Sequence, residues 1–429
     1  MNDTDLIGFA GLSHLGIVYS MATAARGFRV TAFDGREGLA GSLAEGRFPI
    51  SEPGLTELFQ ANQERIRYTG DIGELAGCGL IFFALDVPTD AANRSDLGAL
   101  EQLFGAVSAQ AAPGTVLVVM SQVPPGFSRD LAARLRPDLQ LYYQVETLIF
   151  GNAIERAVRP ERYMVGCPDP STPFTGLYSR FLEAFECPVL PMRYESAELC
   201  KIAINCFLVS SVSTANTLAG ICEAIQADWS EIVPALRLDR RIGPYAYLQP
   251  GLGIAGGNLE RDLITVQELA GKHGCDARVV TAWQQNSAYC RDWVLRRLSR
   301  LGLLADPSAV LGLWGLAYKA DTHSIKNSPS LGLLRALPAY RWSAYDPVAR
   351  IDASEFPNLR LCGSPLEAVR DAAALVVMTP WKEFAGVDLE HAREGTRGRI
   401  IVDPYAALDG RRCRELGFRY YSRGADFEC

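Results

Sequence analysis

The first residues with a chemical signature form a glycine-rich turn, Gly11-Leu-Ser13-His14-Leu15-Gly16, directly after the apolar run Leu6–Ala10. The spacing is that of the G-x-G-x-x-G turn, which directs backbone N–H groups and a helix N-terminus at a pyrophosphate. Asp34 ends the next apolar run, 18 residues after Gly16, where its carboxylate can accept the ribose hydroxyls of NAD. An ordinary strand–turn–helix can use the same glycines, and Arg36 leaves NADP open. The strand context and Asp34 together predict NAD.

A second candidate group lies in the mostly apolar stretch Glu198–Cys206. Lys201 and Asn205 are four residues apart, so they share one face of a helix. A single lysine in such a stretch commonly extends its ammonium to solvent. The asparagine on the same face favours a polar site instead.

A third segment has four glycines in the seven residues 251–257, ahead of a predicted helix. Glycines there would let a substrate approach the backbone closely. We expect Asn258 to cap the helix and Asp262 to lie in its first turn, where a carboxylate is favoured. A flexible loop with an ordinary cap would look the same, so this segment gains meaning only beside the others.

The elements that must position these groups change in type along the chain. Short apolar runs alternate with amphipathic stretches over about the first 190 residues, which is typical of a parallel α/β sheet. The expected strands are Leu6–Ala10, Val30–Phe33, Leu80–Leu85, Val116–Ser121, Leu141–Val145 and Tyr163–Val165. The expected helices lie near 15–26, 97–111 and 127–135.

After Pro191 the pattern becomes helical. We predict one long helix over 196–227 and further helices over 229–238, 260–272 and 276–303, with a Gly/Pro-rich segment at 242–257. A second α/β rhythm follows, with expected strands Ala309–Leu313, Ser343–Tyr345, Ala374–Met378 and Ile400–Val402. The predicted fold class is therefore α/β, with Rossmann-like domains at 1–195 and 301–429 joined by a helical region at 196–300.

Composition limits the function classes. The 42 Lys+Arg and 49 Asp+Glu leave a net charge of −7 without basic blocks, which argues against nucleic acid or an anionic membrane as partner. Four histidines and no CxxC pair among 11 cysteines predict no metal site and reduced thiols. Residues 1–10 lack an export signal, and no uninterrupted apolar stretch is long enough to span a bilayer, so a cytoplasmic protein is expected.

Together these segments resemble the UDP-glucose/GDP-mannose 6-dehydrogenase family. The resemblance runs in the family's order and spacing from about residue 5 to about residue 405. Its further motifs are Ser51–Leu55, Ser121–Gly126, Glu146–Gly151, Pro160–Arg162, Ser196–Asn205, Asp239–Pro244, Gly315–Lys319, Ser328-Pro329, Tyr345–Pro347 and Asp403.

The resemblance implies an NAD-binding Rossmann domain, a helical linker that forms a homodimer core, and a C-terminal Rossmann-like domain that binds a sugar nucleotide. Such enzymes oxidise the sugar C6 alcohol to a carboxylate through two hydride transfers to NAD. A cysteine of the glycine loop captures the intermediate aldehyde as a thiohemiacetal, which the second transfer converts to a thioester for hydrolysis.

Individual positions take roles from the same resemblance. Lys201, Asn205 and Asp262 match the residues that remove the alcohol proton, and Glu146 matches the glutamate of thioester hydrolysis. Arg241 matches an arginine that reaches the partner subunit's substrate. The expected cofactor contacts are Gly11, Ser13, His14, Leu15, Gly16, Asp34, Arg36, Asp86, Pro88, Ser121 and Gln122. The expected substrate contacts are Glu146, Thr147, Leu148, Lys201, Asn205, Arg241, Gly253, Gly256, Gly257, Tyr318 and Lys319.

The departures from the family pattern concern the second half of the chemistry. The nucleophilic cysteine is Asn258 here, and a carboxamide nitrogen is not nucleophilic. Gln122 replaces a threonine of the hydrolytic step, Asp86 replaces a glycine near the cofactor, and Tyr405 replaces an arginine that holds the substrate. Cys200 and Cys206 flank the catalytic face of the predicted helix but point away from it, so we expect no replacement nucleophile.

Three hypotheses follow, in this order. The first is an NAD-dependent oxidoreductase that oxidises a UDP-sugar once, by two electrons, or a variant that re-reduces its product as an epimerase. The second is a four-electron dehydrogenase without a covalent intermediate, in which Asn258 hydrogen-bonds a hydrated aldehyde. The third is a non-catalytic sugar-nucleotide-binding protein. Retained polar groups in an apolar setting argue against the third.

Overall fold

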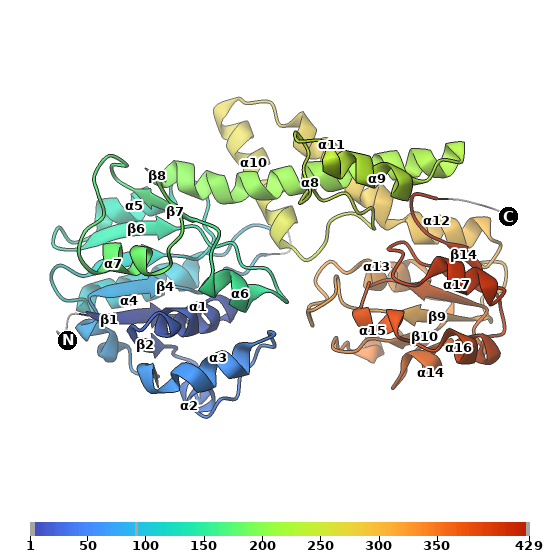
Figure 1. Ribbon diagram of the computed structural model, residues 1–429, viewed down its shortest axis with the longest axis horizontal. Coiled ribbons are helices and arrows are strands. Elements are labelled where there is room, and N and C mark those ends of the chain that lie inside the picture. Colours follow the sequence, from blue (N-terminus) through green and yellow to red (C-terminus); the bar gives the residue numbers. More distant parts are fainter. Residues whose placement is uncertain (1–4, 91–92, 426–429) are drawn as a thin grey trace. The chain divides into compact units, whose positions relative to one another are not determined.

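The computed structural model describes residues 5–90 and 93–425, and its contacts divide the chain into two compact units that meet between Ile204 and Asn205. The boundary falls inside the long helix α8 (Tyr194–Ile225). The predicted class is confirmed, because each unit contains a Rossmann-like sheet (Figure 1).

The first unit is built on an eight-stranded sheet of order β3-β2-β1-β4-β5-β6-β7-β8. Its strands are β1 (Leu6–Ala10), β2 (Arg29–Phe33), β3 (Ile66–Thr69), β4 (Leu80–Phe83), β5 (Val116–Val119), β6 (Gln140–Gln144), β7 (Tyr163–Cys167) and β8 (Val189–Arg193). Its helices, besides α8, are α1 (His14–Ala25), α2 (Leu39–Ala44), α3 (Leu55–Asn62), α4 (Gly98–Gln110), α5 (Phe127–Arg134), α6 (Ala153–Val158) and α7 (Gly176–Ala184).

Alternation along the central strands fills two cores, one on each face of this sheet. In β4, Leu80 and Phe82 join the cluster that contains α1, α3, α6 and α7, whereas Ile81 and Phe83 join the cluster that contains α4 and α5. All four side chains are 0% exposed, and burying each stabilises the fold by about 1.5–3 kcal/mol. A strand buried on both faces reads as a continuous apolar run, which is why β4 was predictable.

The sheet differs from the expected all-parallel arrangement at one place. Strands β6 and β7 pair antiparallel, with Tyr143 opposite Gly166. The two edge strands, β3 and β8, were not predicted from the sequence. Both are weak signals, because β3 is short with a polar alternate residue and β8 contains Pro191, which an edge strand tolerates.

The second unit combines helices with a six-stranded parallel sheet of order β11-β10-β9-β12-β13-β14. The strands are β9 (Val310–Trp314), β10 (Arg341–Tyr345), β11 (Leu359–Leu361), β12 (Ala374–Val377), β13 (Ile400–Val402) and β14 (Arg419–Tyr421). The helices are α9 (Trp229–Leu238), α10 (Asn258–His273), α11 (Arg278–Arg291), α12 (Trp293–Arg300), α13 (Pro329–Ala336), α14 (Pro365–Val369), α15 (Lys382–Ala385), α16 (Leu389–Gly395) and α17 (Gly410–Glu415).

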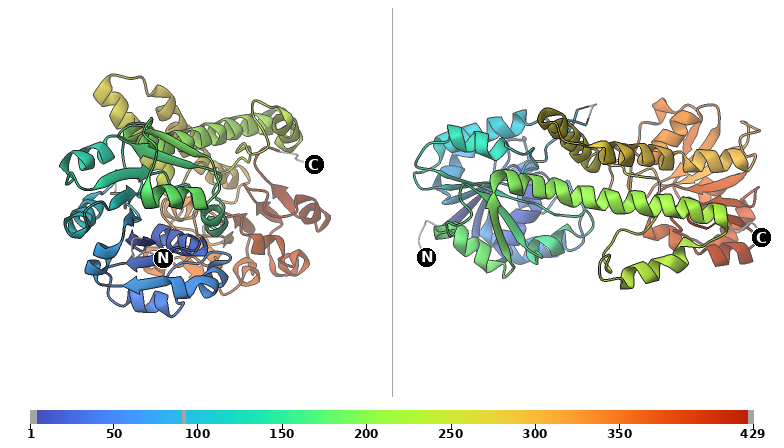
Figure 2. Two further views of the ribbon diagram at one scale, coloured as in Figure 1. Left: turned by 60° about the vertical axis from the view of Figure 1, so that its left-hand side comes forward. Right: turned by 90° about the horizontal axis from the view of Figure 1, so that it is seen from above.

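Helix α8 runs unbroken (Figure 2), and α11 and α12 lie along its second half. The Asn286 amide donates to Thr217 Oγ1 at 3.0 Å, and the Trp293 indole N–H donates to Glu223 at 2.9 Å. The single helix predicted over 276–303 is wrong, since α11 ends and α12 begins at Asp292. The break is consistent with burial of Trp293 and Arg297 on one face of α12.

Both sheets begin with the same turn. Gly11 and Gly315 each follow the first strand of their sheet with φ +94°, and each N–H donates to the last carbonyl of the neighbouring strand, Phe33 or Tyr345, at 2.9 and 2.8 Å. An aspartate follows that neighbouring strand in both cases. Asp34 accepts the Leu12 N–H at 2.8 Å, and Asp346 accepts the Leu316 N–H at 2.7 Å.

By length and mean hydropathy, α8 is also the one helix in the described part of the chain that could cross a bilayer. Its most apolar 18-residue stretch is 28% buried. The run 202–222 is uncharged but not uninterrupted, because polar residues such as Asn205, Ser210 and Asn216 interrupt it. Glu198 is fully buried and accepts the N–H groups of Gly126 at 2.6 Å and Ser128 at 2.7 Å, at the start of α5. The helix therefore supplies an internal cap to the first unit.

Candidate functional site

The glycine turn at 11–16 has the close approach that a nucleotide-binding turn requires. A Cβ on Gly16 would lie 2.0 Å from the Gly11 carbonyl oxygen, and a Cβ on Gly11 would lie 2.5 Å from the Leu85 side chain. Neither position can hold a larger residue without moving the backbone. The turn therefore brings the first residues of α1 close to the end of β1.

Ser13, at the middle glycine position, leaves this arrangement intact. Its hydroxyl donates to the Ala84 carbonyl at 2.9 Å and so points away from the first turn of α1. The N–H groups of that turn are the donors that a pyrophosphate needs. Leu15 packs its side chain into the core at 6% exposure, so only its backbone faces this region. The residues present thus fit NAD.

Asp34 stands at the end of β2, as predicted, and is 5% exposed. Its carboxylate accepts the Leu12 N–H and two hydrogen bonds from the Arg36 guanidinium, both at 2.9 Å. Burial alone would raise the pKa of Asp34, but these hydrogen bonds outweigh it and the pKa is lowered. Asp34 is therefore a fixed anion paired with Arg36. The Arg36 guanidinium must move before ribose hydroxyls can donate to this carboxylate.

His14 connects the glycine turn to the loop that carries Glu146. Its Nε2 lies 2.8 Å from Glu52 Oε1, and its ring packs on Phe150 with the centroids 4.4 Å apart. The fully buried Glu52 side chain also accepts the N–H groups of Gly151 and Ala153, at 3.0 and 3.2 Å. The Ser51–Leu55 motif thus holds two loops of the first unit together.

The remaining predicted cofactor contacts follow the ends of β4 and β5. Ser121 is fully buried and donates to the Leu85 carbonyl at 2.7 Å, which fixes the segment that continues to Asp86 and Pro88. Asp86 is exposed, and its charge raises the pKa values of both Arg36 and Glu146 after the larger causes. Gln122 follows Ser121 in the same region.

Glu146 and Lys201 form the charged pair of the first unit. Lys201 Nζ lies 3.8 Å from Glu146 Oε2, and the other Glu146 oxygen accepts the Leu148 N–H. Burial raises the pKa of Glu146, and the Lys201 charge opposes that rise. Arg156 holds the same loop, because its Nε donates to the Thr147 carbonyl at 2.8 Å.

Asn205 and Asp262 form the matching pair of the second unit. The Asn205 amide donates to Asp262 Oδ2 at 2.5 Å, and Arg261 Nε lies 3.5 Å from Asp262 Oδ1. Asp262 is 1% exposed. A carboxylate so buried keeps its charge only beside such donors. Lys201 and Asn205 lie one turn apart on α8, as the spacing predicted.

The glycine loop packs against side chains that leave no room for a Cβ. A Cβ on Gly253 would lie 2.5 Å from Ser287 Oγ, one on Gly256 would lie 2.4 Å from Tyr318, and one on Gly257 would lie 3.0 Å from Lys326. All three glycines have positive φ. Tyr318 therefore packs against the loop at Gly256, and Lys319 follows it in the same turn.

The predicted cap of α10 is wrong. The N-cap is Gly257, with φ +96°, and the exposed Asn258 is the first helical residue. A left-handed approach to the helix favours glycine over asparagine there. Glu260 occupies the first turn instead of Asp262, and its carboxylate accepts the Gly257 N–H at 2.9 Å. Asn258 is thus free of a capping role and presented at the head of the helix.

Arg241 is an exposed residue in the turn that follows α9. Its side chain is 88% exposed and pairs with Asp239 at 2.6 Å.

Sequence reasoning missed the residues behind the glycine loop, above all Asn216 and Arg423. Arg423 carries no motif, and its partners lie more than 170 residues away in the chain.

The described cysteines offer no activated thiol at this site. Burial raises the pKa of the Cys206 thiol, and the nearby Asp262 charge raises it further. Cys200 Sγ lies 3.4 Å from the Met164 sulfur. In the described residues no group of three His, Cys, Asp or Glu side chains could hold a metal ion.

We therefore expect Cys206→Ser to leave turnover within about twofold of wild type, because a protonated thiol is a poor nucleophile. Steady-state kinetics with a matched thermal melt would check this. A variant that folds normally but does not turn over would overturn the conclusion that thiols take no part.

Comparison with protein-family models places three domains of one family along the chain in order. The NAD binding domain of the UDP-glucose/GDP-mannose dehydrogenase family matches residues 5–182, the central domain 195–288 and the UDP binding domain 312–410. The first matched segment contains the glycine turn, Asp34 and Glu146. The second contains Lys201, Asn205 and Asp262, and the third contains Tyr318 and Lys319.

Relatives agree with this assignment. The UDP-glucose 6-dehydrogenase AglM of Haloferax volcanii is 30% identical over 92% of this chain and 96% of its own length. The UDP-glucose 6-dehydrogenase of Pseudomonas aeruginosa is 29% identical over 96% of both chains. Among solved structures, a UDP-glucose dehydrogenase from Pyrobaculum islandicum is 25% identical with a TM-score of 0.84, covering 98% of both chains.

Proposed function

Because the chain belongs to the UDP-glucose/GDP-mannose dehydrogenase family, it is an NAD-dependent nucleotide-sugar dehydrogenase that acts on a CH–OH group, and we propose that it performs a single two-electron oxidation. The observation that carries this proposal is Asn258 at the head of α10, exposed and outside the capping hydrogen bonds. A carboxamide there cannot capture an aldehyde as a covalent adduct. Oxidation would then stop at the carbonyl product.

The retained groups suit the first oxidation. In that step the alcohol loses its hydroxyl proton to a base and its carbon-bound hydrogen as hydride. NAD supplies the hydride acceptor when it is bound at the turn 11–16 and Asp34. We assign proton removal to Asp262 and stabilisation of the developing alkoxide to Lys201, with Asn205 fixing the Asp262 carboxylate at 2.5 Å. Glu146, paired with Lys201 at 3.8 Å, would hold the ammonium in place.

One observation favours the four-electron alternative. Glu146 matches the glutamate of the hydrolytic step in the resemblance, and here it is retained and held by the Leu148 N–H. In that alternative, water adds to the aldehyde, Asn258 hydrogen-bonds the hydrate, and a second hydride leaves without a covalent intermediate. The loss of the threonine at Gln122, together with the cysteine, favours the single oxidation.

Counting NADH per sugar nucleotide tests the proposal. The protein would be incubated with NAD and a panel of UDP-sugars, with UDP-glucose first because a UDP binding domain matches residues 312–410. We expect one NADH per substrate and a product two hydrogens lighter. Two NADH and a product that has also gained an oxygen would establish the four-electron route. An isomeric product without net NADH would indicate an epimerase, and binding without conversion a non-catalytic protein.

We also propose a homodimer formed through α8. Phe207, Leu218, Ile221 and Ile225 recur on one face of the helix and are 76%, 40%, 47% and 66% exposed. A second copy of this face would cover them, and the exposed Arg241 would reach the partner's substrate as in the resemblance. A bilayer is a poorer occupant, because Asn216 and Glu223 of the same helix hydrogen-bond loops of the second unit. Sedimentation equilibrium at the mass of one chain would refute the dimer.

We keep the division 1–195, 196–300 and 301–429 and a cytoplasmic location as proposals. The three family models follow that division closely. The ten cysteines in the described part of the chain are all free, which suits a reducing compartment. Cell fractionation with thiol labelling would contradict the location if the protein were found oxidised outside the cytoplasm.

A further inference from the structure

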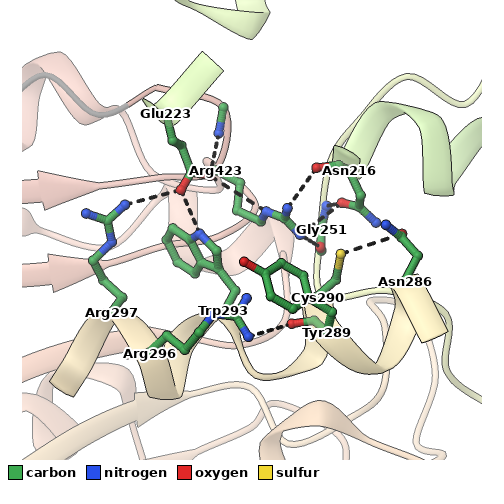
Figure 3. Close-up of polar contacts among 11 residues, drawn as sticks. Asn216, Glu223, Gly251, Asn286, Tyr289, Cys290, Trp293, Arg296, Arg297 and Arg423 are labelled. Atoms are coloured by element: carbon green, nitrogen blue, oxygen red, sulfur yellow. Dashed lines mark hydrogen bonds and ion pairs between the residues drawn. The ribbon is translucent and has the colours of Figure 1, made fainter. Parts of the chain in front are cut away.

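A buried polar network lies behind the glycine loop and includes Arg423, close to the C-terminus (Figure 3). Arg423 is 7% exposed. Its Nη1 donates to Asn216 Oδ1 at 3.0 Å and to the Gly251 carbonyl at 2.5 Å, and its Nη2 donates to the Asn216 carbonyl at 3.0 Å. One guanidinium thus joins α8 to the first residue of the glycine loop.

Gly251 is held from both of its backbone polar groups. Its carbonyl accepts from Arg423, and its N–H donates to Asn216 Oδ1 at 2.8 Å. Because Asn216 Oδ1 also accepts from Arg423, the three residues form a closed ring of hydrogen bonds (Figure 3). Neither peptide group of Gly251 can rotate without breaking one of them.

The Tyr405 ring packs against the same glycine. A Cβ on Gly251 would lie 2.8 Å from the Tyr405 ring, and Gln249 donates to the Tyr405 carbonyl at 3.3 Å. Burial raises the pKa of Tyr405 to about 12, and the Leu252 N–H and the Arg423 charge oppose that rise. The position that carries a substrate-holding arginine in the resemblance therefore carries a side chain that packs on the loop.

Glu223 holds the chain at Arg423 and Gly424. One Glu223 oxygen accepts the Gly424 N–H at 3.2 Å and lies 3.9 Å from Arg423 Nε, while the other accepts from Trp293 and Arg297. Glu223 thereby fixes residues 423–424 to α8 and α12 (Figure 3). The guanidinium has little freedom to follow the loop if the loop moves.

The glycine loop is also held between Gly251 and the start of α10. Between Gly251 and Asn258, the chain passes Gly253 and Gly256, which touch Ser287 and Tyr318 with no room for a Cβ. The Ile254 N–H also donates to Ser287 Oγ at 2.9 Å. The loop is therefore held along its length, by the Arg423 ring at its start and by Ser287 and Tyr318 before α10.

We propose that Arg423 is a positioning residue that holds the glycine loop in the conformation that binds the sugar nucleotide. It acts through Gly251 and Asn216 and contacts neither substrate nor cofactor itself. The proposal rests on the proposed function only for the identity of the ligand. It concerns the position of residues 251–258, which can be measured without turnover.

The test compares Arg423→Ala with Arg399→Ala. Arg399 also donates its guanidinium to carbonyls, those of Arg393, Thr396 and Gly398, but does not touch residues 249–257. For Arg423→Ala we expect KM for the sugar nucleotide to rise about tenfold or more with kcat changed less than about threefold. Ethylguanidinium should restore the KM of Arg423→Ala. The KM of Arg423→Lys should lie between those of wild type and Arg423→Ala, because lysine keeps the charge but donates from one nitrogen only. The control should match wild type.

Amide hydrogen exchange separates failure of this proposal from failure of the proposed function. Peptides covering 251–258 should exchange at least about tenfold faster in Arg423→Ala, while those covering 11–16 are unchanged. That result would support positioning even if no UDP-sugar were oxidised. Unchanged exchange at 251–258, or an unchanged KM in both Arg423 variants, would overturn it. If Arg423→Ala fails to fold, Arg423→Lys carries the same two measurements.

Discussion

Replacing Asn258 by cysteine is expected to raise the yield from one NADH to two per sugar nucleotide. The substituted residue would be the first of the 16-residue helix α10, where a helix N-terminus lowers the pKa of a thiol. A thiolate there could add to the aldehyde left by the first oxidation, and oxidation of that adduct would give a thioester. Asp262, Asn205 and Glu146 remain in place for both steps.

The measurement is the NADH count together with the mass of the intact protein. A thioester intermediate would add the mass of the substrate to the chain, and its hydrolysis would release a carboxylate. Asn258→Ala is the matched control, because it removes the carboxamide without supplying a nucleophile; it should yield one NADH. If Asn258→Cys also yields one NADH and no adduct, the missing thiol is not what limits the reaction to one oxidation.

Lys201→Ala is expected to lower kcat by about 10³-fold, within the range lost when one group that stabilises a developing oxyanion is removed. Lys201 Nζ is the cation 3.8 Å from Glu146, and its side chain is only 14% exposed. Its removal would take away both the cation that stabilises the developing alkoxide and the charge that opposes the raised pKa of Glu146. The Glu146 carboxyl would then be protonated at a higher pH than in the wild type.

Stopped-flow measurement of NADH formation would follow this variant, with NAD affinity measured separately. Affinity for NAD should be unchanged, since the turn 11–16 and Asp34 do not contact Lys201 in their hydrogen bonds. Lys272→Ala removes an exposed lysine from the last turn of α10 and serves as control. A kcat for Lys201→Ala within threefold of wild type would remove Lys201 from the proposed chemistry.

The sequence predicts the parts of the fold whose signals are local. The central strands β1, β4 and β5 are continuous apolar runs because both faces of the sheet are covered, and α8 shows helical spacing along most of its length. Edge strands such as β3 and β8 carry mixed or interrupted patterns. The end of α11 at Asp292 also has no glycine or proline to mark it.

The candidate site divides in the same way. The glycine turn, Asp34 and the Lys201–Asn205 spacing are short-range patterns, and the structure places each as expected. Gly257 takes the capping position predicted for Asn258 because the left-handed approach to α10 is visible only in the backbone. The Arg423 ring depends on partners 172 and 207 residues away, which no spacing rule connects.

The twin turns at Gly11 and Gly315 have a consequence for the number of cofactors. In the second turn the carbonyls of Gly315, Leu316 and Ala317 accept the hydroxyls of Ser330, Ser328 and Thr379 at 2.7–2.8 Å, and Asp346 accepts the N–H groups of Leu316 and Ala317. That turn satisfies its polar groups internally, whereas the first presents the start of α1. Three hydroxyl side chains thus distinguish two nearly equivalent backbones, and we expect a chain with two dinucleotide-type folds to bind one dinucleotide.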